Sequence, residues 1–192
     1  LAWSPDSKQI AYTCRKKIGL HYAVSTDSDI YLYNIESGKT TNLCKPANYI
    51  APKVDYTRSL KDQAVNAPIK EGKDYNLGYD TNPQFSPDGK FIAWQSMERD
   101  GYESDQNRLC VMDLATGMQN YITGMPDEKG YTAFDSNVDG FCWAPDSKSL
   151  YFTGTWHGAT QVYNITLKGK LTQMTEGDYD YQSVAMIGKD LL

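Results

Sequence analysis

The sequence Trp3-Ser-Pro-Asp-Ser-Lys8 returns twice, as Phe85-Ser-Pro-Asp-Gly-Lys90 and Trp143-Ala-Pro-Asp-Ser-Lys148. Each copy runs directly into a short apolar segment of strand-forming residues, at 9–14, 91–96 and 149–153. Proline presets φ for the first central position of a type I turn, and aspartate is accepted at the second. Each copy therefore predicts a tight turn between two antiparallel strands. Copies that share one register predict a structural unit repeated along the chain.

A second group of strands follows at the same place in each copy. Alternating apolar residues occupy the segments 29–35, 108–114 and 161–165. Each segment leads into a short strand with an apolar end, after a turn at Gly38, Gly117 and Gly169. Together with the strand that enters the next aromatic, one unit contains four antiparallel strands. This is the pattern of a β-propeller blade.

The spacing of the copies predicts an incomplete propeller with an insertion. The aromatics stand at positions 3, 85 and 143, and Ala185 begins a degenerate fourth copy, so the steps are 82, 58 and 42 residues. Propeller repeats usually run about 40–50 residues, so the first step contains extra chain. We expect an all-β fold, a partial β-propeller of about four repeats with truncated first and last blades. The expected divisions are blade material at 1–44, an insertion at 45–76, blades at 77–123 and 124–175, and the start of the next blade at 176–192.

The composition narrows the classes of function. Of the 192 residues, 40% are hydrophobic and 12% aromatic, which is ordinary for a folded β protein. The 19 basic and 24 acidic residues give a net charge of −5 without a basic stripe, which argues against a nucleic-acid partner. The apolar runs have only strand length, so no membrane span is expected. The four cysteines form no C-x-x-C pair, so we expect neither a zinc site nor a cofactor, while disulfide pairing stays open.

No complete catalytic constellation occurs in the sequence. A serine hydrolase requires a G-x-S-x-G elbow, which is absent, and the two histidines, His21 and His157, fall in expected loops. The stretch 135–140 reads D-x-N-x-D-G, like the start of a calcium-binding loop. The twelfth position would be Asp146, which belongs to the repeated turn, so a polar loop is the better interpretation. We therefore assign no catalytic residue and no metal ligand.

A charged loop at 97–108 is the candidate binding element. It is longer than a tight hairpin needs, and it contains four acidic and two basic residues: Glu98, Asp100, Glu103, Asp105, Arg99 and Arg108. It is either a solvated hairpin tip or a charged projection into a ligand or subunit contact. The corresponding loop of the first blade, 15–27, is also long but basic.

The repeated aromatic-Ser-Pro-Asp-Gly-Lys-x-Ile-Ala unit resembles the blades of two groups, the TolB-like periplasmic proteins and the prolyl oligopeptidase family of serine peptidases. The stretches 78–103 and 146–154 look most like the propellers of bacterial dipeptidyl peptidase IV-like and acylaminoacyl-peptidase-like enzymes. The resemblance implies a longer, periplasmic or secreted protein whose C-terminal α/β-hydrolase domain carries a Ser-Asp-His triad. This chain would be its non-catalytic propeller segment, which gates access to the active site and helps to bind peptide substrate.

The same resemblance suggests the site residues. In dipeptidyl peptidase IV a pair of adjacent glutamates holds the amino end of the substrate, and this chain has no Glu-Glu pair. Glu98 and Glu103 are therefore the candidate ligands of a substrate ammonium group, with Arg99 beside them. The alternative is a TolB-like or WD-repeat-like scaffold that binds a protein partner and catalyses nothing. In both cases a half ring exposes strand edges, so the isolated segment is expected to self-associate or to be unstable.

Overall fold

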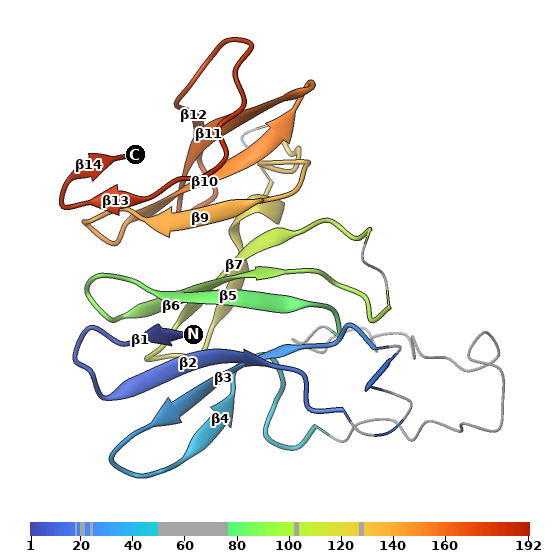
Figure 1. Ribbon diagram of the computed structural model, residues 1–192, viewed down its shortest axis with the longest axis vertical. Coiled ribbons are helices and arrows are strands. Elements are labelled where there is room, and N and C mark those ends of the chain that lie inside the picture. Colours follow the sequence, from blue (N-terminus) through green and yellow to red (C-terminus); the bar gives the residue numbers. More distant parts are fainter. Residues whose placement is uncertain (18, 20–21, 24, 50–76, 102–103, 127–128) are drawn as a thin grey trace, which may run out of the picture.

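The computed structural model describes residues 1–17, 19, 22–23, 25–49, 77–101, 104–126 and 129–192 (Figure 1). The first sheet consists of β1 (Ala2–Trp3), β2 (Gln9–Cys14), β3 (Asp29–Asn34) and β4 (Thr40–Asn42). The second consists of β5 (Asp80–Phe85), β6 (Phe91–Ser96), β7 (Arg108–Asp113) and β8 (Gln119–Tyr121). The third consists of β9 (Gly140–Trp143), β10 (Ser149–Trp156), β11 (Ala159–Thr166) and β12 (Leu171–Gln173). A short 3-10 helix, η1 (Ile122–Gly124), follows β8, and the last strands are β13 (Met186–Ile187) and β14 (Asp190–Leu191).

Each four-stranded sheet is an antiparallel meander whose strands are neighbours in the order of the chain. The aromatic before each Pro-Asp turn lies opposite the aliphatic residue after it, in the pairs Trp3–Ile10, Phe85–Ile92 and Trp143–Leu150. Contacts join β1 to β5 and β5 to β9, so the first strands of the three sheets are neighbours, as in the inner ring of a propeller. The fold is all-β, and it is the partial propeller that the repeats predicted.

The first two copies of the repeated turn show what its serine and its aspartate do. The Ser4 hydroxyl donates to the Asp6 carboxylate at 2.6 Å and accepts the backbone N–H of Gln9 at 2.9 Å. Ser86 repeats this arrangement in the second blade. The residue that leaves the turn has a positive φ, 71° at Gly89 and 58° at Ser7, a conformation that glycine adopts without strain. The serine hydroxyl therefore links the aspartate of the turn to the backbone of the strand that follows the turn.

Two apolar clusters lie between the blades, one on each face of the second sheet. Ile92 and Trp94 on β6 belong to the cluster shared with the first blade. Ala93, between them, belongs to the cluster shared with the third blade, which includes Phe152 and Tyr163. Successive side chains of a strand point to opposite faces, so the continuous apolar run of β6 serves both interfaces.

The short turns and the longer loops lie at opposite ends of the blades. Figure 1 shows the Pro-Asp turns and the glycine turns at one end and the longer loops at the other. We call the second end the loop face. Its described residues belong to the connections between second and third strands (15–17, 19, 22–23, 25–28, 97–101, 104–107 and 157–158) and to the connections between blades (43–49, 77–79, 122–126, 129–139 and 174–185). Every cluster of functional interest described below lies there.

A separate two-stranded sheet lies in the segment where the sequence predicts the start of the next blade. Strands β13 and β14 pair as a hairpin, and the backbone N–H groups of Ala185 and Leu192 donate to each other's carbonyl oxygen at 3.0 and 2.8 Å. Residues 50–76, most of the predicted insertion, lie outside the described residues. The division of the chain into blades and an insertion at residues 45–76 stays a prediction.

Candidate functional site

The loop between β6 and β7 is closed by an ion pair. The Arg99 guanidinium forms a bidentate contact with Asp105, including Nε to Oδ1 at 2.9 Å, and the backbone N–H of Arg99 donates to Asp105 Oδ2 at 2.8 Å. The hydrogen bonds from Arg99 lower the pKa of the Asp105 carboxyl. Arg99 therefore braces the base of the loop, and its side chain shapes the loop as well as facing solvent.

Beside this pair lies a small charged cavity of about 370 Å³, lined by Glu98, Arg99, Asp105, Gln106 and Arg108. Arg108 lies 3.8 Å from the Glu98 carboxylate, and its guanidinium stacks on the Tyr121 ring at 4.3 Å from the centroid. The Glu98 side chain is 57% exposed, so its carboxylate faces the solvent side of the cavity. None of the lining residues is a serine, cysteine or histidine. The cavity therefore offers charged groups for binding and no nucleophile with a base.

Asp100 attaches this loop to the first blade. Its buried carboxylate accepts the Ser25 hydroxyl at 2.8 Å and the backbone N–H groups of Thr26 and Asp27 at 2.8 and 3.2 Å. In return, the backbone N–H of Gly101 donates to the Thr26 hydroxyl at 2.8 Å. The long loops of two neighbouring blades are thus joined next to the charged cavity, because Asp100 directly follows two of the lining residues, Glu98 and Arg99.

Beneath the junction lies a buried ionic cluster. Lys45 contacts the carboxylates of both Asp27, at 2.6 Å, and Asp29, and Lys17 reaches the other oxygen of Asp27 at 2.5 Å. Burial raises the pKa of Asp27. Burial opposes the charge on Lys45, but the two carboxylates outweigh that effect and raise the pKa of Lys45. The pairing keeps a charged lysine in the interior, where an isolated ion would be costly.

Among the described residues, the group best placed to bind a metal consists of Asp29, Cys44 and Asp80, whose ligand atoms lie within 4.8 Å of one another. Burial raises the pKa of the Cys44 thiol well above its usual value and that of Asp80 to about 7. The Lys45 ammonium already neutralises Asp29, and the Trp94 indole N–H donates to Asp80 at 2.9 Å. A protonated thiol and a carboxylate already paired with an ammonium are poor ligands for a cation, so the group is an interior hydrogen-bonding cluster.

The sequence-predicted residues have mixed outcomes. Glu98 and Arg99 do share a cavity, but Arg99 is engaged with Asp105. Glu103, the third candidate, lies outside the described residues, as does His21. The calcium-like stretch is a loop in which the Asn137 side chain accepts the backbone N–H of Asn107 at 2.8 Å, so this side chain serves blade packing. All four cysteines are free thiols.

Comparison with known proteins shows the family to which the chain belongs. The chain is 46% identical to dipeptidyl-peptidase 5 of Porphyromonas gingivalis over 181 residues, which cover 94% of this chain and 21% of that protein. The chain is a propeller segment homologous to dipeptidyl-peptidase 5. Dipeptidyl-peptidase 5 of Porphyromonas endodontalis is 39% identical over the whole chain, which covers 23% of that protein. The chain thus spans about a fifth of the length of these dipeptidyl-peptidase 5 relatives. No family model matches the sequence.

Solved structures support the fold. TolB from Acinetobacter baumannii superimposes with a TM-score of 0.51 at 17% identity, over 88% of this chain and 31% of that one. A chain of a nidogen/laminin complex gives 0.51 at 13% identity, over 95% of this chain and 50% of that one. At such identities these likenesses concern the propeller fold alone. Within the described residues, no helix combines the length and apolarity needed to cross a membrane.

The sequence alone did not predict the buried ionic cluster of Asp27, Asp29 and Lys45. Asp27, Asp29 and Lys45 look like ordinary polar residues of a loop, a strand start and an insertion, yet all three are buried. The neighbouring sequence does not indicate these ion pairs, because Lys45 follows β4 and lies 18 residues after Asp27 and 16 residues after Asp29. One signal was available: Asp27-Ser-Asp29 precedes an apolar strand, where a carboxylate at the sheet end needs a partner.

Proposed function

We propose that this chain is the non-catalytic propeller segment of a dipeptidyl-peptidase 5-like serine exopeptidase. It gates access to, and helps to bind peptide substrate for, a hydrolase domain elsewhere in the same polypeptide. The observation that carries the proposal is the 46% identity to dipeptidyl-peptidase 5 along 94% of the chain. The charged, nucleophile-free cavity of the loop face is consistent with binding without catalysis.

Glu98 is the residue proposed to meet the substrate's ammonium group. Its carboxylate is 57% exposed at the mouth of the cavity, and Arg108 holds it loosely at 3.8 Å. A free dipeptidyl amino terminus is cationic at neutral pH and forms charge-assisted hydrogen bonds with a carboxylate. Arg99 is a positioning residue, because its contact with Asp105 sets the shape of the loop.

The experiment uses the full-length gene product and dipeptidyl chromogenic substrates with a free amino end. We expect hydrolysis by the full-length protein and none by residues 1–192 alone. Glu98→Gln is expected to lower kcat/KM about tenfold or more, mainly through KM, because a charge-assisted hydrogen bond is lost. The matched control is Glu176→Gln, which changes an exposed glutamate of another loop-face connection.

The outcomes separate the candidates. A full-length protein that hydrolyses none of these substrates, and yet retains a protein partner, would indicate the scaffold alternative. Hydrolysis by residues 1–192 alone would contradict a non-catalytic role. An unchanged KM in Glu98→Gln would remove Glu98 from the binding site and leave the peptidase assignment standing.

An exported location, periplasmic or secreted, belongs to the same proposal and rests on the resemblance of the blades to exported peptidases. Fractionation of the native cells with an antibody to the propeller tests it. Recovery of the protein in the cytoplasmic fraction alone would contradict it.

A further inference from the structure

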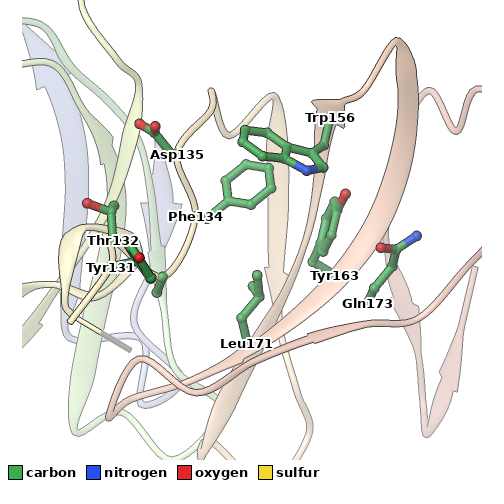
Figure 2. Close-up of a pocket in the computed structure, with 9 residues that line it drawn as sticks. Tyr131, Thr132, Phe134, Asp135, Trp156, Tyr163, Leu171 and Gln173 are labelled. Carbon is green, nitrogen blue, oxygen red and sulfur yellow. The ribbon is translucent and has the colours of Figure 1, made fainter. Parts of the chain in front are cut away.

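The third blade carries a second cavity on the loop face, unrelated to the charged one. It measures about 540 Å³, within the size range of small-molecule sites, and no residue is common to the two cavities. Its walls come from the connection between the second and third blades, at 131–135, and from β10, β11 and β12. Figure 2 shows Phe134, Trp156 and Tyr163 grouped on one side, with Tyr131 and Thr132 facing them.

The aromatic wall is built by close packing. Phe134 lies 4.9 Å from Tyr163 and 6.4 Å from Trp156, measured between ring centroids, and it meets Phe152 edge to face at 5.0 Å. Gly154 makes this possible, because a Cβ at that position would lie 2.6 Å from Cζ of Phe134. The rings are therefore fixed in place before any ligand arrives, which lowers the entropy cost of binding.

Trp156 is held at the rim by the tightest connection of the three blades. It pairs with Ala159 across a two-residue turn, in which His157 and Gly158 have φ of 52° and 85°. These positive values are those of a type I′ hairpin. The His157 ring packs edge-on against the indole at 4.9 Å, while the indole remains 43% exposed. An ordered, exposed tryptophan next to a cavity presents its π face to a ligand.

The polar groups of the cavity select the charge of that ligand. Asp135 contributes a carboxylate at the rim, and none of the nine lining residues is basic. The Gln173 amide nitrogen donates to the carbonyl of Thr175 at 2.8 Å, and Figure 2 shows its oxygen turned toward the side of Tyr163. The side chains thus offer a carboxylate, an amide oxygen and negative ring faces, an arrangement that attracts cations.

We propose that this aromatic pocket binds an organic cation, an ammonium or guanidinium group on an apolar stem. The stem packs against Leu171 and Phe134, and the cation lies against the exposed Trp156, in a pocket where Asp135 is the one acidic residue among the nine that line it. The cation belongs either to a free amine or to a lysine or arginine side chain of a peptide. The pocket extends to β12, the strand of the blade farthest from β9, so it lies away from the inner ring.

Calorimetric titration of the full-length protein tests the proposal with four probes. Benzylamine and tetramethylammonium represent free amines, Nα-acetyl-arginine amide represents a side chain, and benzyl alcohol is the neutral counterpart. We expect at least one cation to bind about tenfold more tightly than benzyl alcohol. We expect Trp156→Leu, which keeps apolar bulk and removes the π face, and Asp135→Asn each to weaken that binding by about threefold to thirtyfold.

The controls separate this pocket from the charged cavity. Asp178→Asn removes another exposed carboxylate, outside both cavities, and is expected to leave cation binding unchanged. Unfolding temperatures of Trp156→Leu and Asp135→Asn within a few degrees of the parent exclude loss of the fold. Equal affinity for benzyl alcohol, absence of binding by every cation, or a loss of binding in Glu98→Gln but not in Trp156→Leu would each overturn the proposal.

Discussion

The buried carboxylate of Asp100, on the loop of the second blade, accepts the hydroxyl of Ser25, on the loop of the first, at 2.8 Å. This bond crosses from one repeat to the next at the loop face. It explains how two long loops from neighbouring blades are held together next to Glu98. The identities of Asp100 and Ser25 are therefore coupled to the packing of the two blades.

Asp100→Ala is expected to destabilise the protein by about 2–4 kcal/mol, because it leaves the buried Ser25 hydroxyl and the backbone N–H of Thr26 without their acceptor. Asp100→Asn keeps an acceptor oxygen in place and is the matched control, expected to cost about 1 kcal/mol or less. Urea denaturation measures both. Equal stability of the two variants would show that the carboxylate does not fasten the loops.

Lys45→Met is expected to destabilise by about 3–5 kcal/mol, because the buried carboxylates of Asp27 and Asp29 lose the ammonium that neutralises them. Adding Asp27→Asn and Asp29→Asn to Lys45→Met is expected to recover part of that loss, since no buried carboxylate is left unpaired; the recovery is partial because Lys17 loses its contact with Asp27. A double-mutant cycle built on denaturation curves measures the coupling. Additive losses would contradict a shared ionic cluster.

Stability is expected to fall as the pH rises from about 4 toward 7, through Asp80. Burial raises the pKa of Asp80 from 3.8 to about 7 in the folded protein, so between these values the folded state holds a proton that the unfolded state has released. Since the folded state binds more protons, the free energy of unfolding decreases with pH, by up to about 4 kcal/mol across this window. Burial raises the pKa of Asp27 as well, and its contribution has the same sign.

The measurement is chemical denaturation at several pH values, with Asp80→Asn as the comparison. The asparagine keeps an acceptor for Trp94, which donates to Asp80 at 2.9 Å, and it cannot ionise. The variant is expected to show a much flatter pH profile. A variant slope equal to that of the parent would assign the pH dependence to other groups.

Gly154→Ala is expected to destabilise by about 1–3 kcal/mol and to disturb the aromatic pocket, because the new methyl would lie 2.6 Å from Phe134 Cζ and 2.9 Å from the carbonyl oxygen of Asn137. Gly140→Ala is the control, since a Cβ there has only an ordinary contact, 3.8 Å from the Thr153 hydroxyl. Thermal unfolding compares the two. Equal melting temperatures would mean that Phe134 moves aside without cost.

Residues 1–192 produced alone are expected to self-associate, because the blades do not close into a ring. Trp3 on β1 is 57% exposed and Ile187 on β13 is 65% exposed, and both belong to the end blades. Exposed apolar residues next to unpaired strand edges favour association. Light scattering over a dilution series measures it, and a monomer that resists concentration would contradict the expectation.

The repeats made the fold predictable, while the sites depended on contacts that repeats do not encode. A Pro-Asp turn and an alternating strand are local, so the strands at 9–14 and 91–96 are confirmed with the residues expected. Lys45 and Asp29 meet only because β3 and β4 pair, and Trp156 joins Phe134 only because the connection that precedes β9 folds back against β10 and β11. His157 was predicted in a loop, but its role in supporting Trp156 requires the three-dimensional turn.

The most direct measurement is the product pattern when the full-length protein is incubated with an unblocked hexapeptide and the digest is followed by mass spectrometry. If the chain is the propeller of a dipeptidyl-peptidase 5-like enzyme, dipeptides are released in sequence from the amino end, and an acetylated copy of the peptide stays intact. Release of single residues, cleavage within the peptide, or an unchanged hexapeptide would contradict that assignment.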